Sequence, residues 1–148
     1  MALSIKPYIE NKERIHLIGI GGVSMSALGE LLLSLGVPVS GSDRLKTDVT
    51  ARLESLGAKI TYEHKAENVE GASLIVRTAA VHDDNPEIVR AHALDIPVME
   101  RAEAWGHLMR DYDNVVCLAG THGKTTSTSM MTLMTMEAGL DPTVMVGS

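Results

Sequence analysis

The sequence predicts an α/β protein: a Rossmann-like, doubly wound parallel sheet, followed by the first strand, glycine-rich loop and helix of a second, incomplete domain. Strand-like and helix-like patterns alternate from residue 14 to residue 109, and a glycine-rich turn follows the first apolar run. A second glycine-rich turn comes after a polar break at residues 110–114. Alternation of this kind is typical of parallel sheets with helices on both faces. We expect one domain at 1–112 and the start of another at 113–148.

The first glycine-rich turn occupies Gly19–Gly22, between an apolar run and a helix pattern. Gly19 allows a tight turn, and the missing side chain of Gly21 allows a pyrophosphate to approach the backbone. The N–H groups at the start of the helix then face an anion. Ser24 stands where the G-x-G-x-x-G pattern has its third glycine. The alternative is a tight turn that binds nothing.

The other elements of the first domain follow from periodicity and from helix start and stop signals. Strands are expected at residues 14–18, 37–40, 59–62, 72–76 and 96–99. Helices are expected at residues 25–35, 48–56 and 101–109, and from Asn85 and Pro86 onward, with Asp48 as a possible N-cap and Gly36 and Gly57 as helix ends.

Two polar positions are expected at the carboxyl ends of strands, the edge where ligands bind in open α/β sheets. Asp43 lies about twenty residues after the glycine turn, where the acidic residue of a dinucleotide-binding unit meets a ribose. An ordinary turn aspartate is the alternative. Thr78 and Ala79 follow the apolar central strand.

Composition excludes several classes of function. The chain has 148 residues, a net charge of −6 and 3% aromatic residues, which argues against a nucleic-acid binder. No apolar run approaches the roughly 20 residues that span a bilayer, and residues 1–7 do not resemble a secretory signal. The single cysteine, Cys117, lies in an apolar run and is expected to be a buried thiol. We therefore expect a cytoplasmic protein that contacts neither nucleic acid nor membrane.

The second glycine-rich turn follows an expected strand at 115–119 and has the composition of a loop that holds ATP phosphates. A backbone cradle, one lysine and a following hydroxyl suit a triphosphate with Mg²⁺. The loop is shorter than G-x-x-x-x-G-K-[ST], because Leu118 stands at the first glycine position. The candidate ATP-binding residues are Gly120, Thr121, His122, Gly123, Lys124, Thr125 and Thr126.

A helix is expected at 124–138, with Met130, Met131, Leu133 and Met134 on a face suited to burial, followed by the start of a strand at 143–146. A P-loop domain needs several more strands, so this piece is not expected to bury that face by itself. We expect it to pack on the first domain, to be mobile, or to self-associate through residues 124–138.

The ordered set of motifs resembles the Mur ligases of peptidoglycan synthesis, over nearly the whole chain from about Arg14. The motifs are Gly19-Ile20-Gly21-Gly22 with Met25, Ser40-Gly41-Ser42-Asp43, Asp84-Asn85-Pro86-Glu87, Arg101-Ala102-Glu103, and Ala119-Gly120-Thr121-His122-Gly123-Lys124-Thr125-Thr126. Ile20 favours the alanine-adding branch, because the branch that reattaches recycled peptide usually has cysteine between these glycines. Ser24, where the family usually has glycine, is the main departure.

The resemblance implies a three-domain enzyme, involved in cell-wall formation, that joins L-alanine to the carboxylate of UDP-N-acetylmuramate through an acyl phosphate. It implies that the first domain binds the UDP substrate, through Gly19, Gly21, Gly22, Val23, Ser24, Met25 and Ser26 at the diphosphate, Asp43, Thr78 and Ala79 near the nucleoside, and Arg101 at a phosphate. ATP and Mg²⁺ would bind the second loop, with Lys124 as the catalytic cation and Thr125 as a Mg²⁺ ligand. Further catalytic groups of the family lie beyond Ser148, so residues 1–148 alone are expected to be inactive.

Two other classes of function remain open at this level. One is a nicotinamide-dependent oxidoreductase, based on the first glycine turn and Asp43; the Gly-Lys-Thr-Thr sequence counts against it, because a dehydrogenase has no use for a second phosphate loop. The other is a non-catalytic nucleotide-binding module. Binding of UDP-N-acetylmuramate, NAD and ATP would separate the three.

Overall fold

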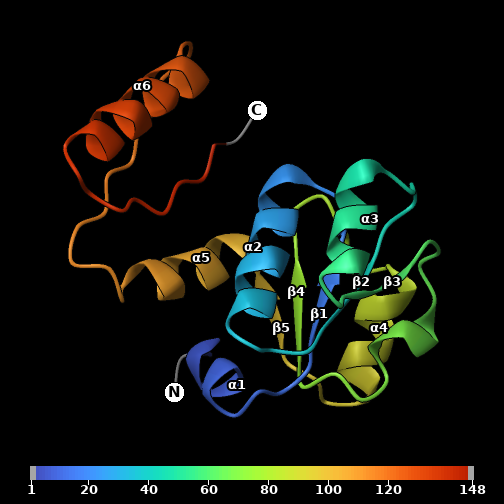
Figure 1. Cartoon of the computed structure of the whole chain (residues 1–148). Helices are drawn as coiled ribbons and strands as arrows, with labels where there is room; N and C mark the ends of the chain where they lie inside the picture. Colours follow the sequence, from blue (N-terminus) through green and yellow to red (C-terminus); the bar gives the residue numbers. More distant parts are fainter. Residues whose placement is uncertain (1–2, 147–148) are drawn as a thin grey trace. The chain divides into compact units, whose positions relative to one another are not determined.

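The computed structural model describes residues 3–146, which fall into two compact units divided between Tyr112 and Asp113 (Figure 1). The division follows the polar break in the sequence. Each unit has its own secondary structure.

The first unit is built on a five-stranded, wholly parallel sheet with the strand order β3-β2-β1-β4-β5. This confirms the predicted doubly wound α/β fold. The strands are β1 (Ile15–Ile18), β2 (Val39–Ser42), β3 (Lys59–Thr61), β4 (Leu74–Arg77) and β5 (Val98–Glu100). The chain runs outward from β1 to β3 and then returns to place β4 on the other side of β1. The order therefore reverses between β1 and β4.

Helices join these strands and cover the sheet. In chain order they are α1 (Lys6–Glu10), α2 (Val23–Ser34), α3 (Asp48–Ser55), the 3-10 helix η1 (Ala66–Val69), α4 (Pro86–Ala93) and α5 (Arg101–Met109). The predicted helix at 101–109 is confirmed at both ends. The helices predicted at 25–35 and 48–56 are also present, and their ends lie within two residues of the predicted positions. Among residues 3–146, no helix has the length and apolar character needed to cross a membrane.

Side chains alternate between the two faces of the sheet, so successive residues of β1 enter different cores. Ile15 and Leu17 pack with residues of α2 and α5 in the larger core. Ile18 packs in a smaller core with residues of α4, η1 and β4. His16 points to the same face as Ile18 and is also buried. One face is therefore wholly apolar near β1, whereas the other contains a buried polar group.

The second strand lies two residues later than predicted, at 39–42 instead of 37–40. The glycine of the Ser-Gly-Ser sequence is consequently inside the sheet and not in a loop. A Cβ at Gly41 would lie 2.6 Å from Ile20 Cδ1 and 2.8 Å from the Leu17 carbonyl oxygen. Gly41 is therefore needed so that buried Ile20, the second residue of the glycine turn, can pack over β2.

Local signals at the helix ends are mostly as predicted. Gly36 and Gly57 have φ values of 75° and 106° just beyond α2 and α3, and the Asn85 side chain accepts a hydrogen bond from the Glu87 N–H at the start of α4. The N-cap of α3 is Thr47 and not Asp48. Its hydroxyl accepts from the Thr50 N–H, and the Thr50 hydroxyl accepts in return from the Thr47 N–H.

The second unit contains one regular element among its described residues, helix α6 (Lys124–Glu137). This confirms the predicted helix, but the strands predicted at 115–119 and 143–146 are wrong, because neither segment is part of a paired strand. Cys117 is exposed, so its expected burial is also wrong. Helix α6 has no buried residue, and Met130, Leu133 and Met134 are exposed. An apolar run becomes a strand only when another strand supplies hydrogen bonds, and residues 113–146 supply none.

Candidate functional site

The candidate site of the first unit lies at the carboxyl edge of its sheet, where the strand order reverses. Leu17 of β1 pairs with Val76 of β4, so the glycine turn after β1 and the Thr78–Ala79 segment after β4 emerge side by side. Arg101 opens α5 directly after β5 and starts from the same edge. Ligands of open parallel sheets bind at such a reversal. The fold thus brings the predicted UDP-site residues to one edge.

The glycine turn is held by hydrogen bonds to the end of the neighbouring strand β2. Four successive backbone N–H groups are engaged: Gly19 to the Ser42 carbonyl (2.8 Å), Ile20 to the same carbonyl (3.0 Å), Gly21 to Asp43 Oδ2 (2.8 Å) and Gly22 to the Gly19 carbonyl (3.1 Å). Gly19 has a φ of 78°, as a tight turn requires. The turn is therefore a fixed frame whose own N–H groups are already in use.

The backbone N–H groups that are available to an anion directly follow the glycine turn, in the first turn of α2. Among residues 3–146, the backbone N–H groups of Val23 and Met25 have no hydrogen-bond acceptor, whereas that of Ser26 bonds to the Gly22 carbonyl. The side chains of Met25 and Ser26 are buried. Met25 can therefore meet a ligand only through its backbone N–H, whereas the N–H and the hydroxyl of Ser26 already donate to the Gly22 and Val23 carbonyls. Since the N-terminus of a twelve-residue helix carries positive potential, this first turn has the backbone donors and the electrostatic character that suit an anion.

Asp43 braces the glycine turn. Its Oδ2 accepts from the Gly21 N–H, and its Oδ1 accepts from the Leu45 N–H at 3.1 Å. A Cβ at Gly21 would lie 2.8 Å from Asp43 Oδ2 and 3.1 Å from Thr50 Cγ2. The missing side chain at Gly21 therefore makes room for the Asp43 carboxylate, a reason different from the pyrophosphate approach expected from the sequence.

Ser24, the departure from the glycine pattern, is in contact with the only tryptophan of the chain. The Trp105 Nε1–H lies 3.1 Å from Ser24 Oγ and 3.3 Å from the Ser24 carbonyl oxygen. The indole comes from α5, so this contact joins α5 to the first turn of α2. A glycine at position 24 would lack the hydroxyl acceptor. The serine thus has a structural role that the sequence pattern did not indicate.

A buried carboxylate lies beneath this edge, and sequence reasoning missed it. Glu87 is fully buried, and its two oxygens accept four hydrogen bonds: from His16 Nε2 (3.1 Å), Asn68 Nδ2 (2.9 Å), Ser42 Oγ (2.8 Å) and His64 Nδ1 (2.7 Å). A signal for it was present. His16, Ser40 and Ser42 occupy inward positions of neighbouring strands on one face, and such polar groups need a partner.

The four donors stabilise the ionised form of Glu87. Burial by itself raises the pKa of this carboxyl, but the hydrogen bonds from His16, Asn68, His64 and Ser42 together outweigh it and hold the pKa below its usual value. Ser40 Oγ lies 2.9 Å from His16 Nδ1. A neutral His16 satisfies both contacts if Nε2 carries the proton toward Glu87 and Nδ1 accepts from Ser40. The cluster is thus fully hydrogen-bonded around one negative charge.

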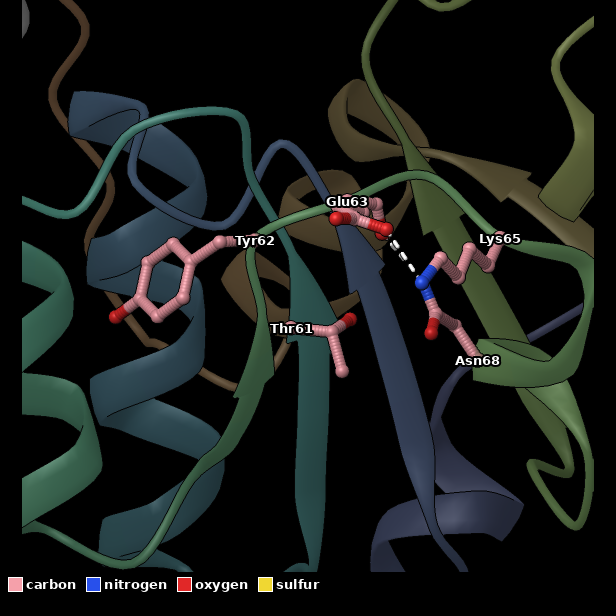
Figure 2. Close-up of a pocket in the computed structure, with 5 residues that line it drawn as sticks. All are labelled: Thr61, Tyr62, Glu63, Lys65 and Asn68. Carbon is pink, nitrogen blue, oxygen red and sulfur yellow. Dashed lines mark hydrogen bonds and ion pairs between the residues drawn. The ribbon is translucent and has the colours of Figure 1, made fainter.

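Two open hollows border the carboxyl edge. The first, of about 270 Å³, lies beyond the end of β3 and is lined by Thr61, Tyr62, Glu63, Lys65 and Asn68 (Figure 2). Glu63 and Lys65 form an ion pair across it, which lowers the pKa of Glu63 and raises that of Lys65. Asn68 belongs to both this hollow and the Glu87 cluster.

The second hollow, of about 300 Å³, surrounds Arg77 at the end of β4. Arg77 forms ion pairs with Asp83 and, at 3.0 Å, with Glu100. The hydrogen bond to Asp83 is the main cause that raises the pKa of Arg77. Because its charge is balanced by two carboxylates, Arg77 supports the strand ends and has little charge to offer an anion.

In the second unit, the predicted phosphate loop 120–126 leads into α6. Gly123 is the N-cap of α6 and has a φ of 76°, a conformation that favours glycine. Lys124 Nζ donates to the Gly120 carbonyl at 2.8 Å, so the ammonium group folds back over the loop. Within residues 3–146, no three His, Cys, Asp or Glu side chains form a possible metal site. The Mg²⁺ site at Thr125 stays a prediction, as does self-association through residues 124–138.

Comparison with known proteins identifies related sequences and structures. Residues 14–113 match the model of the Mur ligase family, catalytic domain. A UDP-N-acetylmuramate--L-alanine ligase from Geobacter sp. (strain M21) is 52% identical over 135 residues, which are 91% of this chain and 29% of that protein. The UDP-N-acetylmuramate-alanine ligase structure from Thermotoga maritima has a TM-score of 0.85 at 39% identity, covering 91% of this chain and 32% of that one. A murein peptide ligase structure from Psychrobacter arcticus has a TM-score of 0.80 at 27% identity, covering 86% and 27%.

Proposed function

Because this chain belongs to the Mur ligase family, we propose that its first unit binds UDP-N-acetylmuramate and that its second unit carries the ATP-binding loop of an L-alanine-adding ligase. The chain spans about 30% of the length of the curated relatives it matches. The complete reaction is therefore proposed for a protein of the relatives' full length, and substrate binding for the residues present here.

One observation carries the substrate proposal: the open N–H groups of Val23 and Met25 at the start of α2. A diphosphate at this helix end would accept from both and would be favoured by the helix dipole. The nucleoside would extend toward the ends of the neighbouring strands, near Asp43 or Thr78 and Ala79. Arg101, at the start of α5, is proposed as a further phosphate contact.

In the full-length reaction, the muramoyl carboxylate attacks the γ-phosphorus of ATP, forming an acyl phosphate and releasing ADP. The amine of L-alanine then attacks the acyl carbon, and the new amide forms as phosphate leaves. Lys124 would neutralise charge on the transferred phosphoryl group. Thr125 would hold Mg²⁺, which supplies further charge neutralisation at the phosphates.

Isothermal titration calorimetry of the 148-residue chain tests substrate binding, with UDP-N-acetylmuramate, UDP, NAD and ATP as separate ligands. We expect the two uridine ligands to bind with similar affinity and NAD to bind at least about tenfold more weakly, a difference of roughly 1.4 kcal/mol. Tighter binding of NAD than of the uridine ligands would support an oxidoreductase instead. Absence of uridine binding would contradict the proposal.

A matched pair of variants locates the binding. Val23→Pro removes one of the two open N–H groups, and proline is tolerated at the first position of a helix. Asp48→Pro makes the corresponding change at the first position of α3, away from the proposed diphosphate site. We expect the first variant alone to weaken UDP binding. Equal UDP affinities in both variants would show that the diphosphate does not bind at the first turn of α2.

A further inference from the structure

Ser42 occupies a two-sided position between the glycine turn and the buried cluster. Its backbone carbonyl accepts from both Gly19 (2.8 Å) and Ile20 (3.0 Å), so it fixes the first half of the turn. The residue that follows, Asp43, fixes Gly21. The turn therefore takes its position from the last residue of β2 and from the residue after it.

The side chain of Ser42 points the other way, into the cluster around Glu87. Ser42 is fully buried, and its hydroxyl donates to Glu87 Oε2 at 2.8 Å. Hydrogen bonds to a charged acceptor are stronger than those between neutral groups, and a buried acceptor strengthens them further. The orientation of Ser42 is thus tied to the carboxylate of α4.

Glu87 is itself held from several directions. His16 reaches it from β1, the central strand, and His64 and Asn68 reach it from the segment that follows β3. These donors come from elements far apart in the sequence, and the carboxylate is the one acceptor they share. Its position is consequently fixed by the whole sheet edge and not by α4 alone.

We propose that Glu87 is a positioning residue for the substrate site: through Ser42 it sets the glycine turn in the geometry that presents the first turn of α2 to the diphosphate. Glu87 is buried beneath the edge and acts on the ligand through other residues. The inference rests on the proposed function as regards the ligand, but the geometry of the turn can be measured without any ligand.

The test compares Glu87→Gln and Ser42→Ala with Ser40→Ala in the 148-residue chain. Ser40 is the matched control, because its hydroxyl contacts the same cluster through His16 Nδ1, at the side remote from the turn. We expect the amide proton shifts of Gly19 and Gly21 to change in the first two variants and to stay at their wild-type values in Ser40→Ala. Loss of global stability by itself would not move these native-state shifts.

Binding of UDP, measured by calorimetry, should weaken about tenfold in Glu87→Gln and in Ser42→Ala. At metal sites, removing a hydrogen bond that orients a ligating residue lowers affinity by about 10–100-fold, and we expect the lower end of that range for this substrate site. The double variant should be little weaker than either single variant, since both break the same connection. If Glu87→Gln does not fold, Ser42→Ala still decides the matter.

Unchanged Gly19 and Gly21 shifts in Ser42→Ala would overturn the proposal, as would equal changes in Ser40→Ala. The proposed function fails in a different way. If the wild-type chain does not bind UDP, yet the two amide shifts move as expected, the positioning role stands and the ligand assignment is wrong.

Discussion

The two glycine-rich turns of this chain have similar sequences around them but very different surroundings. Each follows an apolar run and opens a helix of more than ten residues. In the first unit, the N–H groups of Gly19–Gly22 are all bonded, chiefly to the neighbouring strand. In the second, the apolar run is unpaired and the loop 120–126 is exposed.

The difference shows that a glycine turn becomes a fixed site through its neighbours and not through its own sequence. Gly19 and Gly123 both adopt positive φ, 78° and 76°, because glycine allows it. What separates them is a second strand: the last residue of β2 gives the first turn a carbonyl, and Asp43, the residue after it, gives a carboxylate. The second loop depends instead on Lys124, whose ammonium group bonds back to the Gly120 carbonyl.

The largest effect is expected for Lys124→Met, because the second loop relies on one charge. In a ligase of the relatives' full length with this sequence, alanine-dependent ADP release should fall by about 10²–10³, the cost typical of removing one group that stabilises transition-state charge. Thermal stability should stay unchanged, since Lys124 is exposed. Lys59→Met, another exposed lysine, is the control. Near-normal turnover in Lys124→Met would contradict the catalytic role.

Glu87→Gln should be next, and it tests the dependence of the first unit on a buried charge. Removing the carboxylate from its four donors should cost roughly 3 kcal/mol of unfolding free energy at pH 7. Urea denaturation at fixed pH measures this. Glu70→Gln is the control, because Glu70 pairs with Arg90 at the surface. A loss no greater than that of the control would mean that the cluster contributes little.

The lowered pKa of Glu87 predicts that the free energy of unfolding depends on pH. The folded-state pKa of Glu87 is lowered from 4.5, so its contribution is present above about pH 4.5 and is lost as the pH falls below it toward the folded-state pKa. His16 and His64 face the same carboxylate. The wild-type chain should therefore lose stability below pH 4.5 more steeply than Glu87→Gln, as followed by urea midpoints. Parallel curves would show that other groups control the acid response.

A smaller effect is expected for Gly21→Val, which presses a side chain against Asp43. Overpacking of this kind costs about 1–3 kcal/mol. UDP affinity should fall at least about tenfold as the glycine turn moves. Gly106→Val is the matched control, because a Cβ there meets no atom within 4 Å. Calorimetry measures the UDP affinity of the two variants, and urea denaturation measures their free energy of unfolding. Equal values in both variants would show that the Asp43 side chain can move aside without loss of stability or binding.

The smallest effect is expected for Ser24→Gly, which restores the glycine of the usual pattern. Losing the indole contact and adding a helical glycine should cost about 1 kcal/mol. Fluorescence of Trp105, the single tryptophan, should shift. Ser34→Gly in the same helix makes a similar stability change without contact to the indole. If both variants leave the emission unchanged, the Trp105 bond does not persist in solution.

The sequence by itself determined the chain order of strands and helices in the first unit, the sheet edge that carries the candidate site, and the helix ends at Gly36, Gly57 and Asn85. These features depend on backbone preferences and on hydrophobic periodicity over a few residues, and both can be recognised in a single sequence. The family resemblance came from the same short motifs, and the matched family model and relatives confirm it.

Tertiary structure alone decided what those motifs contact. The bond of Gly21 to Asp43 spans 22 residues, and that of His16 to Glu87 spans 71. Such pairs are set by strand register and helix packing, so neither residue indicates its partner locally. The apolar run at 115–119 shows the reverse: its composition favours a strand, but pairing requires a neighbour, and none is present among the described residues of that unit.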